Sequence, residues 1–340
     1  MTARTPIVSV VGPEGTNLVP AWGKSLLGLT YTDQAGYESD ELVLRFAAPP
    51  YDLPPKGTKY RLALSWKGER PADFGIFSVS RTALGGDPEN GEELEVTCRA
   101  ADFIDKMKQT SSKHYDEDGG FGTAGSIIRD IAKEAGVPAI IPQELDKIKI
   151  PYRLRWNQSP LDFLTDLADD IGGIIKPQAG RLVVLERGGG KSASGQSLPL
   201  IHMHHNVIYA WDVDLEERTA HESAEADWFD PKSGRLKQAK ASIGKSGGPR
   251  RRLHPAPDET EAGQIASALA GSLNRFTGTG FFEGPGNPLA LSGAEVKASG
   301  YGSDVDGIRW EATSVTHTWE PDGGWLISVD VETMKGSESR

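Results

Sequence analysis

The two ends of the chain carry similar β-rich sequences, and this internal repeat constrains the fold more than any other feature. At a shift of 236 residues, Gly57 aligns with Gly293 without a gap. The other aligned pairs are Phe74 with Trp310, Ser78-Val79 with Ser314-Val315, Ser80 with Thr316, and Thr82 with Thr318. Each copy then passes a glycine turn into a further strand, at residues 91–96 and 324–329. The repeat predicts two β domains of one fold, although two strand-rich stretches can also align by chance.

Composition divides the 340 residues into three regions and a linker. Residues 1–100 form short apolar runs broken by Pro and Gly, which predicts a first β domain with strands near 42–46, 60–64, 76–80 and 94–98. Residues 101–187 predict a small α+β domain that ends in a strand at 181–185. The Gly- and Ser-rich stretch 188–199 predicts a flexible linker. Residues 200–340 return to strands, with one inserted helix from about Glu259 to Arg275 and a hairpin around 321–324.

The two helices of the middle region have recognisable ends. Thr123 is a helix N-cap residue, and Gly136 follows the apolar stripe Ile127, Ile128, Ile131 and Ala135 as a stop. Ser159-Pro160 is an N-cap and first-turn pair, and Gly172 ends the second stripe. These signals predict helices over about 124–135 and 160–171.

Charge and composition exclude several classes of protein. The apolar runs are far shorter than the roughly 20 residues of a membrane helix, and the N-terminus has no apolar stretch typical of a signal peptide. Both observations favour a protein made in the cytoplasm with no stable membrane insertion. The net charge of −11 argues against a general affinity for nucleic acid. Cys98 is the only cysteine, so no intrachain disulfide forms, and we expect it to be buried and inert.

Several segments together resemble the phage late control protein D family, the baseplate hub proteins of Mu-like contractile tails, which are related to type VI secretion spike hubs. The resemblance runs from about Pro6 to Met334 and is carried by weak motifs in the family's order. They lie at residues 39–44, 150–153, 157–164, 180–184, 288–293 and 315–317. The family commonly has Glu-Ser-Asp where this chain has Gln158-Ser159-Pro160, but Ser159 and Pro160 still begin a helix.

The resemblance implies a homotrimer between the hexameric tail tube and the trimeric spike, in contact with other baseplate proteins. The expected fold class is therefore α+β, mainly β, with two similar β-barrel-like tube domains flanking the α+β domain. Three such chains would present six similar units, so a threefold object could meet a sixfold one. DNA would pass through the channel without specific binding, and the protein would be part of the virion, at the tail tip, after assembly in the host cytoplasm. An infectious phage, a tail-like bacteriocin and another injection device all remain open.

Three motifs could indicate a catalytic or binding site, but each lacks the neighbouring residues that such a site requires. Residues 188–192, Gly-Gly-Gly-Lys-Ser, lack the glycine and the following helix of a phosphate loop. Residues 244–248 fit G-x-S-x-G, but Pro249 stands where a helix should begin. His202 and His204 would share a face of a strand next to His205, yet no carboxylate or cysteine stands at a familiar companion spacing.

The remaining charged and aromatic groups favour structural roles. The pairs Asp169-Asp170 and Glu216-Glu217 are expected to be solvated, and the basic run 250–252 is expected to be an exposed loop. Trp310, Trp319 and Trp325 are expected in a core or hairpin. We therefore expect no enzyme and no catalytic, cofactor-binding or metal-binding residues. A hub that also hydrolyses peptidoglycan and a monomeric carbohydrate-binding module are the alternatives, which a zymogram and a glycan column would reveal.

Overall fold

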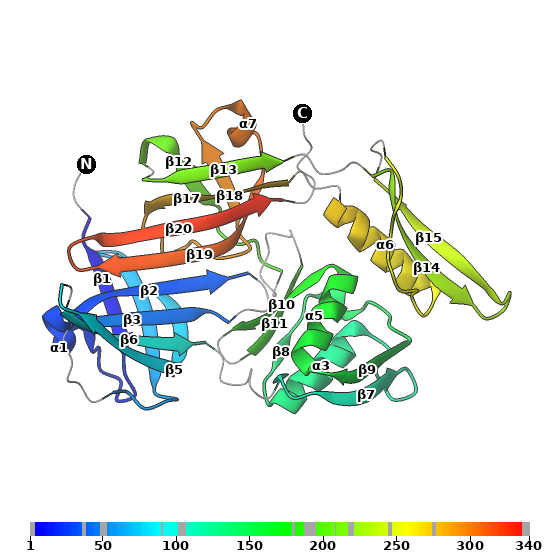
Figure 1. Ribbon diagram of the computed structural model, residues 1–340, viewed down its shortest axis with the longest axis horizontal. Coiled ribbons are helices and arrows are strands. Elements are labelled where there is room, and N and C mark those ends of the chain that lie inside the picture. The colour runs from blue at the N-terminus through cyan, green and yellow to red at the C-terminus, as the bar shows by residue number, and fades with distance from the viewer. Residues whose placement is uncertain are drawn as a thin grey trace.

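The computed structural model describes residues 4–35, 39–47, 53–89, 91–100, 107–178, 181–186, 195–207, 209–216, 221–243, 247–273 and 277–334. Its architecture is α+β and mainly β, as predicted, and Figure 1 shows one large sheet beside two smaller units. Most of the expected linker, residues 188–194, lies outside the described residues. None of the helices in the described ranges has the length and apolar character needed to span a membrane.

The large sheet has twelve strands, drawn equally from the two ends of the chain. The N-terminal half has the order β1 (Pro6–Val11), β4 (Lys59–Trp66), β5 (Ala72–Asp87), β6 (Gly91–Arg99), β3 (Glu41–Ala47) and β2 (Leu26–Gln34). The C-terminal half has the order β12 (Ile201–His204), β18 (Glu295–Ser299), β19 (Trp310–Glu320), β20 (Gly324–Thr333), β17 (Thr277–Pro285) and β13 (Trp211–Glu216). Strand β2 pairs with β19, so the two expected tube domains are halves of one continuous sheet.

Both halves follow the same strand order, but the register of the repeat differs from the predicted one. Val79 lies opposite Cys98 and is followed by a bulge, and Ala312 lies opposite Val331 and is followed by the same bulge. The two hairpins are therefore related by a shift of 233 residues. Phe77, and not Phe74, takes the position of Trp310, and both side chains are fully buried.

A shorter connection explains the three-residue difference. Gly57 and Gly293 both have positive φ, and each donates its N–H to the second strand after it, Gly57 to Val79 O of β5 at 2.8 Å and Gly293 to Ala312 O of β19 at 2.7 Å. The two glycines are therefore equivalent at the predicted shift of 236, whereas the hairpins are related by a shift of 233. The segment between the glycine and the hairpin is three residues shorter in the second copy. The outermost strands also differ, since β1 is antiparallel to β4 whereas β12 is parallel to β18.

The middle region is a compact α+β unit with its own core. It comprises β7 (Ser111–Asp116), α3 (Ala124–Ala135), β8 (Ala139–Ile140), α4 (Gln143–Asp146), β9 (Tyr152–Gln158), α5 (Pro160–Ile171), β10 (Gly173–Gln178) and β11 (Arg181–Glu186). The caps are those predicted: Thr123 and Ser126 form a capping box, and Ser159 Oγ accepts from Asp162 N at 3.1 Å. Gly136 and Gly172 end the helices in the left-handed conformation.

The insertion expected as a single helix is larger than predicted. Helix α6 (Glu259–Leu273) covers a separate sheet of β14 (Ser223–Asp230), β15 (Arg235–Ser242) and β16 (Arg250–Arg251), with Trp228, Ala262 and Ile265 in the shared core. Strand β15 is mostly polar and exposed, so its sequence lacks the apolar alternation that predicts a strand. In Figure 1 this unit stands on the far side of the α+β unit from the N-terminal half.

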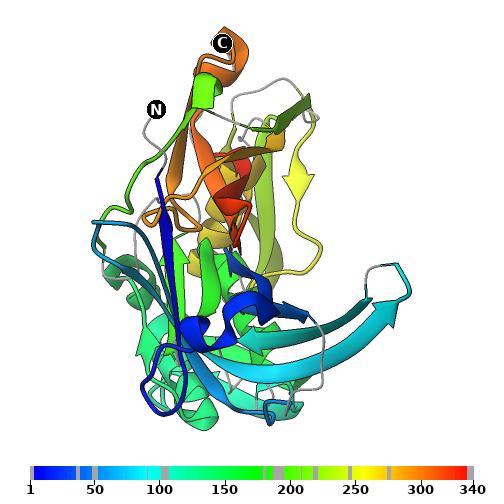
Figure 2. The ribbon, with the colours of Figure 1, turned by 90° about the vertical axis from the view of Figure 1, so that its left-hand side faces the viewer.

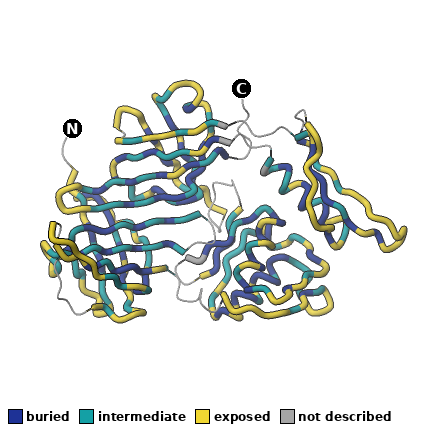
Figure 3. The backbone as a smooth tube through the Cα atoms, in the orientation of Figure 1, coloured by how far each residue is buried: buried dark blue, intermediate teal, exposed yellow. Residues whose placement is uncertain are grey.

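The interior of the large sheet forms two cores, seen as dark strand segments in Figure 3. The short helices α1 (Val19–Trp22) and α7 (Ser303–Asp306) pack against these cores, and two 3-10 turns lie at Gly23–Ser25 and His205–Val207. Trp325 belongs to a strand of the C-terminal half but packs in the core of the N-terminal half. The halves therefore share packing as well as backbone pairing.

Candidate functional site

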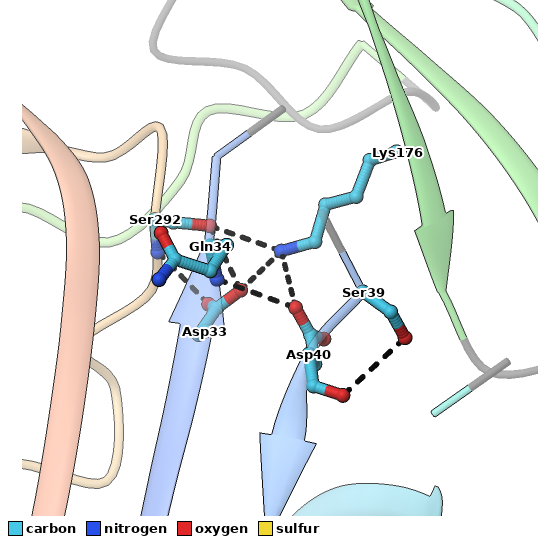
Figure 4. A network of polar contacts seen from close by, with 6 residues as sticks. All are labelled: Asp33, Gln34, Ser39, Asp40, Lys176 and Ser292. Atoms are coloured by element: carbon cyan, nitrogen blue, oxygen red, sulfur yellow. Dashed lines mark hydrogen bonds and ion pairs between the residues drawn. The ribbon is translucent and has the colours of Figure 1, made fainter. Parts of the chain in front are cut away.

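A buried ammonium group joins the α+β unit to both halves of the large sheet. Lys176 of β10 ion-pairs with Asp33 at the end of β2 and lies 3.2 Å from Asp40 Oδ1, just before β3 (Figure 4). It also donates to Ser292 Oγ at 3.0 Å, in the segment before β18. Ser292 in turn donates to Asp33 from its N–H at 2.9 Å and its hydroxyl at 2.8 Å. The α+β unit, the N-terminal half and the C-terminal half meet at this network.

Burial and the opposite charges set the protonation of these groups. Burial alone would raise the pKa of Asp33, but Lys176 and the two Ser292 donors hold it below its ordinary value. Burial and the Asp33 carboxylate raise the pKa of Asp40 to about 7, against the pull of Lys176. Burial would lower the pKa of Lys176, but the two carboxyls raise it. The network therefore holds a stable Asp33–Lys176 ion pair beside a carboxyl that is partly protonated near neutral pH.

This chemistry suits a mechanical joint. Lys176, Asp33 and Asp40 expose almost none of their surface, so a substrate has no route to them. Buried ion pairs demand an exact fit of all partners, and removing one partner leaves an uncompensated charge. Lys176 therefore fixes the α+β unit against the sheet in one orientation.

A second charge network ties the α+β unit to the insertion. Arg153 of β9 donates to Asp170 of α5 at 2.7 Å and to Glu261 of α6 at 3.2 Å. Arg252 donates to the same Asp170 at 2.9 Å. Asp170 is buried, so the expectation that Asp169-Asp170 is a solvated pair is wrong for Asp170, which is held by two guanidinium groups.

The basic run 250–252 is exposed, as expected, but it also makes specific ion pairs and a short strand. Arg251 donates to Glu225 at 3.2 Å, and Arg250 and Arg251 form β16 beside β14. Together with the contact of Arg252 with Asp170, these bonds tie the exposed run to the insertion and to the α+β unit. The sequence misses this because the acidic partners come from distant segments.

The two halves of the sheet are joined by aromatic packing. The rings of Trp66 and Trp325 lie 5.1 Å apart, and Trp66 Nε1 donates to the carbonyl of Gly286 at 2.9 Å. Trp325 Nε1 donates to Nδ1 of His317 at 3.3 Å, and His317 also lies against Tyr31 of the first half. Trp310 and Trp325 are core residues and Trp319 is partly buried, as expected for structural tryptophans.

Substitution of His317 by glutamine should remove a pH-dependent component of stability. Burial lowers the pKa of His317 to about 4, whereas an unfolded histidine titrates near 6.5. The unfolded state therefore takes up the proton first, and the contribution of His317 to stability falls by about 3 kcal/mol between pH 6.5 and 4. Asp40 acts in the opposite direction, because its raised pKa favours the folded state as the pH falls.

The difference between wild type and H317Q isolates the histidine. Urea unfolding at pH 7, 6, 5 and 4.5 should show the wild type losing stability relative to H317Q as the pH falls. A constant difference across this range would mean that His317 does not remain neutral in the folded protein.

The histidine cluster lies on the surface. His202 and His204 share one face of β12, as predicted, with parallel rings 6.3 Å apart, beside a cavity of about 310 Å³. His204 Nδ1 lies 2.5 Å from Ser299 Oγ, and His205 packs on Trp211 and Tyr301. In the part of the chain that is described, no three His, Cys, Asp or Glu side chains are placed to hold a metal.

The other singled-out residues fall into two groups. Cys98 is fully buried in β6, and burial and the nearby Glu41 raise the pKa of its thiol to about 12, so it is unreactive as a thiolate. Residues 188–192, 244–246 and Glu217 lie outside the described residues. Sequence reasoning missed Asp33, Asp40 and Lys176, although a lysine within the apolar run Ile174-Ile175-Lys176 is an available signal, because such a lysine needs a buried counter-charge.

Buried charged contacts and aromatic packing connect the described parts of the fold. The fold is shared with phage tail proteins: a 43 kDa tail protein of the Shewanella oneidensis prophage MuSo2 superposes with a TM-score of 0.66 at 14% identity, over 96% of this chain and 98% of that one. A component of the E. coli type VI secretion system, described as structurally similar to bacteriophage T4 tail proteins, gives 0.58 at 10% identity, over 93% and 75%.

Comparison of the amino-acid sequence identifies more specific relatives among phage proteins. The chain is 28% identical over 244 residues to the probable baseplate hub protein of Escherichia phage 186. The match covers 67% of this chain and 61% of that protein's length. No family model matches the chain. The predicted resemblance is confirmed in these terms: the chain is a homologue of phage baseplate hub proteins and has the fold of phage tail and type VI secretion spike proteins.

Proposed function

We propose that this chain is a structural hub of a contractile phage tail or phage-like particle, and that it works without catalysis. As a homotrimer it would join the hexameric tail tube to the trimeric spike and continue the central channel. Its partners would be the tube or tube-initiator protein, the spike and other baseplate proteins. Its place would be the tail tip of the virion, after assembly in the bacterial cytoplasm.

One observation carries the proposal: each chain contains two six-stranded halves with the same strand order in one continuous sheet. A ring of three chains would present six similar halves to a sixfold tube while keeping three chain-specific faces for a spike. The acidic net charge of −11 suits a channel through which DNA passes without binding. The buried joints at Lys176 and Asp170 would transmit force between the sheet, the α+β unit and the insertion.

The proposal predicts a stable trimer in solution. Analytical ultracentrifugation should give a mass of three times the chain mass of 36.6 kDa. Class averages of the particle by electron microscopy should have six similar lobes on the tube side and three on the opposite side. A stable monomer that binds neither tube nor spike protein would contradict the proposal.

A further inference from the structure

Each half of the sheet has a long hairpin, and only one of the two hairpins is covered by another strand. Strand β19 pairs with β18 only at residues 310–311, and β2 covers its residues 314–319. Strand β5 pairs with β4 as far as Ser78, and no strand in the described ranges covers its residues 81–86 on that side. Figure 2 shows this part of the β5–β6 hairpin extending beyond the rest of the sheet.

The other end of the sheet carries the matching open edge. Strand β13 pairs with β17 and ends the strand order, as far as the chain is described. Val213 lies opposite Gly280 and Gly280 opposite Val331, just as Tyr31 lies opposite Leu42 and Leu42 opposite Cys98. Because Cys98 and Val331 are equivalent, β13 is the equivalent of β2, with Val213 in the place of Tyr31.

We infer that neighbouring copies of this chain join by strand pairing between β13 of one copy and residues 81–86 of β5 of the next. The pairing of β2 with β19 supplies the register, in which Tyr31 lies opposite His317. Transferred by the repeat, this places Val213 opposite Leu84, Trp211 opposite Gly86 and Leu215 opposite Thr82, in antiparallel orientation. The inference deepens the proposed function, because it names the surface through which the trimer would form.

Side chains on the two edges complement each other in this register. Leu84 is 57% exposed and Trp211 is 41% exposed, whereas their equivalents at the internal joint, His317 and Leu29, are 0% and 1% exposed. Residues directly opposite in an antiparallel pair share a face, so all the apolar side chains of β13 would meet Leu84 on one face. The largest of them, Trp211, would lie opposite glycine.

The proposed interface is heterologous, because each copy contributes β13 to one neighbour and residues 81–86 of β5 to the other. Such interfaces form closed rings when the rotation between copies allows it. In a ring of three chains, β2–β19 joints within chains would alternate with β13–β5 joints between chains. The number of chains in the ring follows from the proposed function, whereas the register of the β13–β5 pairing follows from the internal repeat.

Cysteine pairs test the register. L84C/V213C and A83C/D214C place thiols opposite each other on the two faces of the proposed joint, whereas L84C/D214C places them on opposite faces. Cβ atoms of opposed residues lie about 4.5–5.5 Å apart, so mild oxidation should convert at least one in-register variant to covalent dimers and trimers on non-reducing gels. L84C/D214C should remain monomeric on the same gel, and buried Cys98 should not contribute.

The outcomes separate the inference from the function it rests on. A trimer in solution with no in-register cross-link, or with equal cross-linking of L84C/D214C, would overturn the strand pairing and leave the hub function standing. A monomer without any cross-link would overturn both. Unfolding midpoints of the reduced variants should match wild type, which confirms that the cysteines leave the fold intact.

Discussion

Replacing Lys176 by methionine is expected to destabilise the folded chain by about 3–5 kcal/mol, the cost of breaking a buried ion pair from one side. Methionine fills a similar volume but leaves Asp33 and Asp40 in a buried site with no counter-charge. The pKa of both carboxyls should then rise, so the folded variant would hold protons that the unfolded chain releases. Its stability should therefore fall as the pH rises from 5 to 8.

Urea unfolding at pH 5 and pH 8 measures this effect. K113M is the matched control, because Lys113 also pairs with two carboxylates, Asp130 and Glu134, but is one-third exposed. Exposed pairs contribute about 0–1 kcal/mol, so K113M should unfold close to wild type. The assignment of Lys176 as a joint fails if K176M and K113M have the same stability.

The two carboxylates should differ when each is neutralised. D33N removes the ionised partner of Lys176, whereas D40N replaces a carboxyl whose pKa of about 7 already leaves it partly protonated. D33N should therefore cost several times more stability at pH 7 than D40N. Equal losses would show that the charge is shared evenly between them.

Trp325→Ala is expected to have an effect of the same size, about 3–5 kcal/mol, typical of large-to-small substitutions of buried aromatic residues. Trp325 is 2% exposed, packs against Trp66 and donates to His317. Its loss would open a cavity between the two halves of the sheet. Thermal unfolding followed by circular dichroism should show a lower midpoint.

Trp156→Ala is the control for this substitution. Trp156 is 73% exposed on β9, so its removal should change stability by about 0.5 kcal/mol or less. If W325A and W156A unfold at the same temperature, the tryptophan contact does not hold the halves together. On heating, the predicted trimer and its cross-links should be lost at a lower temperature in W325A than in W156A.

Local signals predicted local structure well. Thr123, Ser159, Gly136 and Gly172 mark the helix ends in the structure because capping depends on a few neighbouring residues. The repeat is visible in the sequence, but the ungapped shift of 236 places its hairpin register three residues away from that of the structure. An ungapped comparison cannot see the shorter connection between Gly293 and Trp310.

Contacts between residues that are far apart in the chain could not be predicted from the sequence. Lys176 lies 143 positions from Asp33 and 116 from Ser292, and nothing local to any of them specifies the partner. The sequence around Asp170 predicts a solvated pair because its arginine partners come from β9 and from the segment after β16. The helix of the insertion is predictable, but its small sheet is not, since the charged residues of β15 hide its strand character.

The covalent link between the two halves has a consequence for assembly. A joint between segments of one polypeptide forms at a high effective concentration, independent of how much protein the cell contains. A joint between separate molecules costs translational and rotational freedom, and therefore depends on expression level. With the β2–β19 joint formed during folding, a six-unit ring would need only two bimolecular encounters, because the third joint between chains closes within the assembled trimer. Partial rings would be correspondingly rare, and ring formation would respond steeply to the amount of protein made.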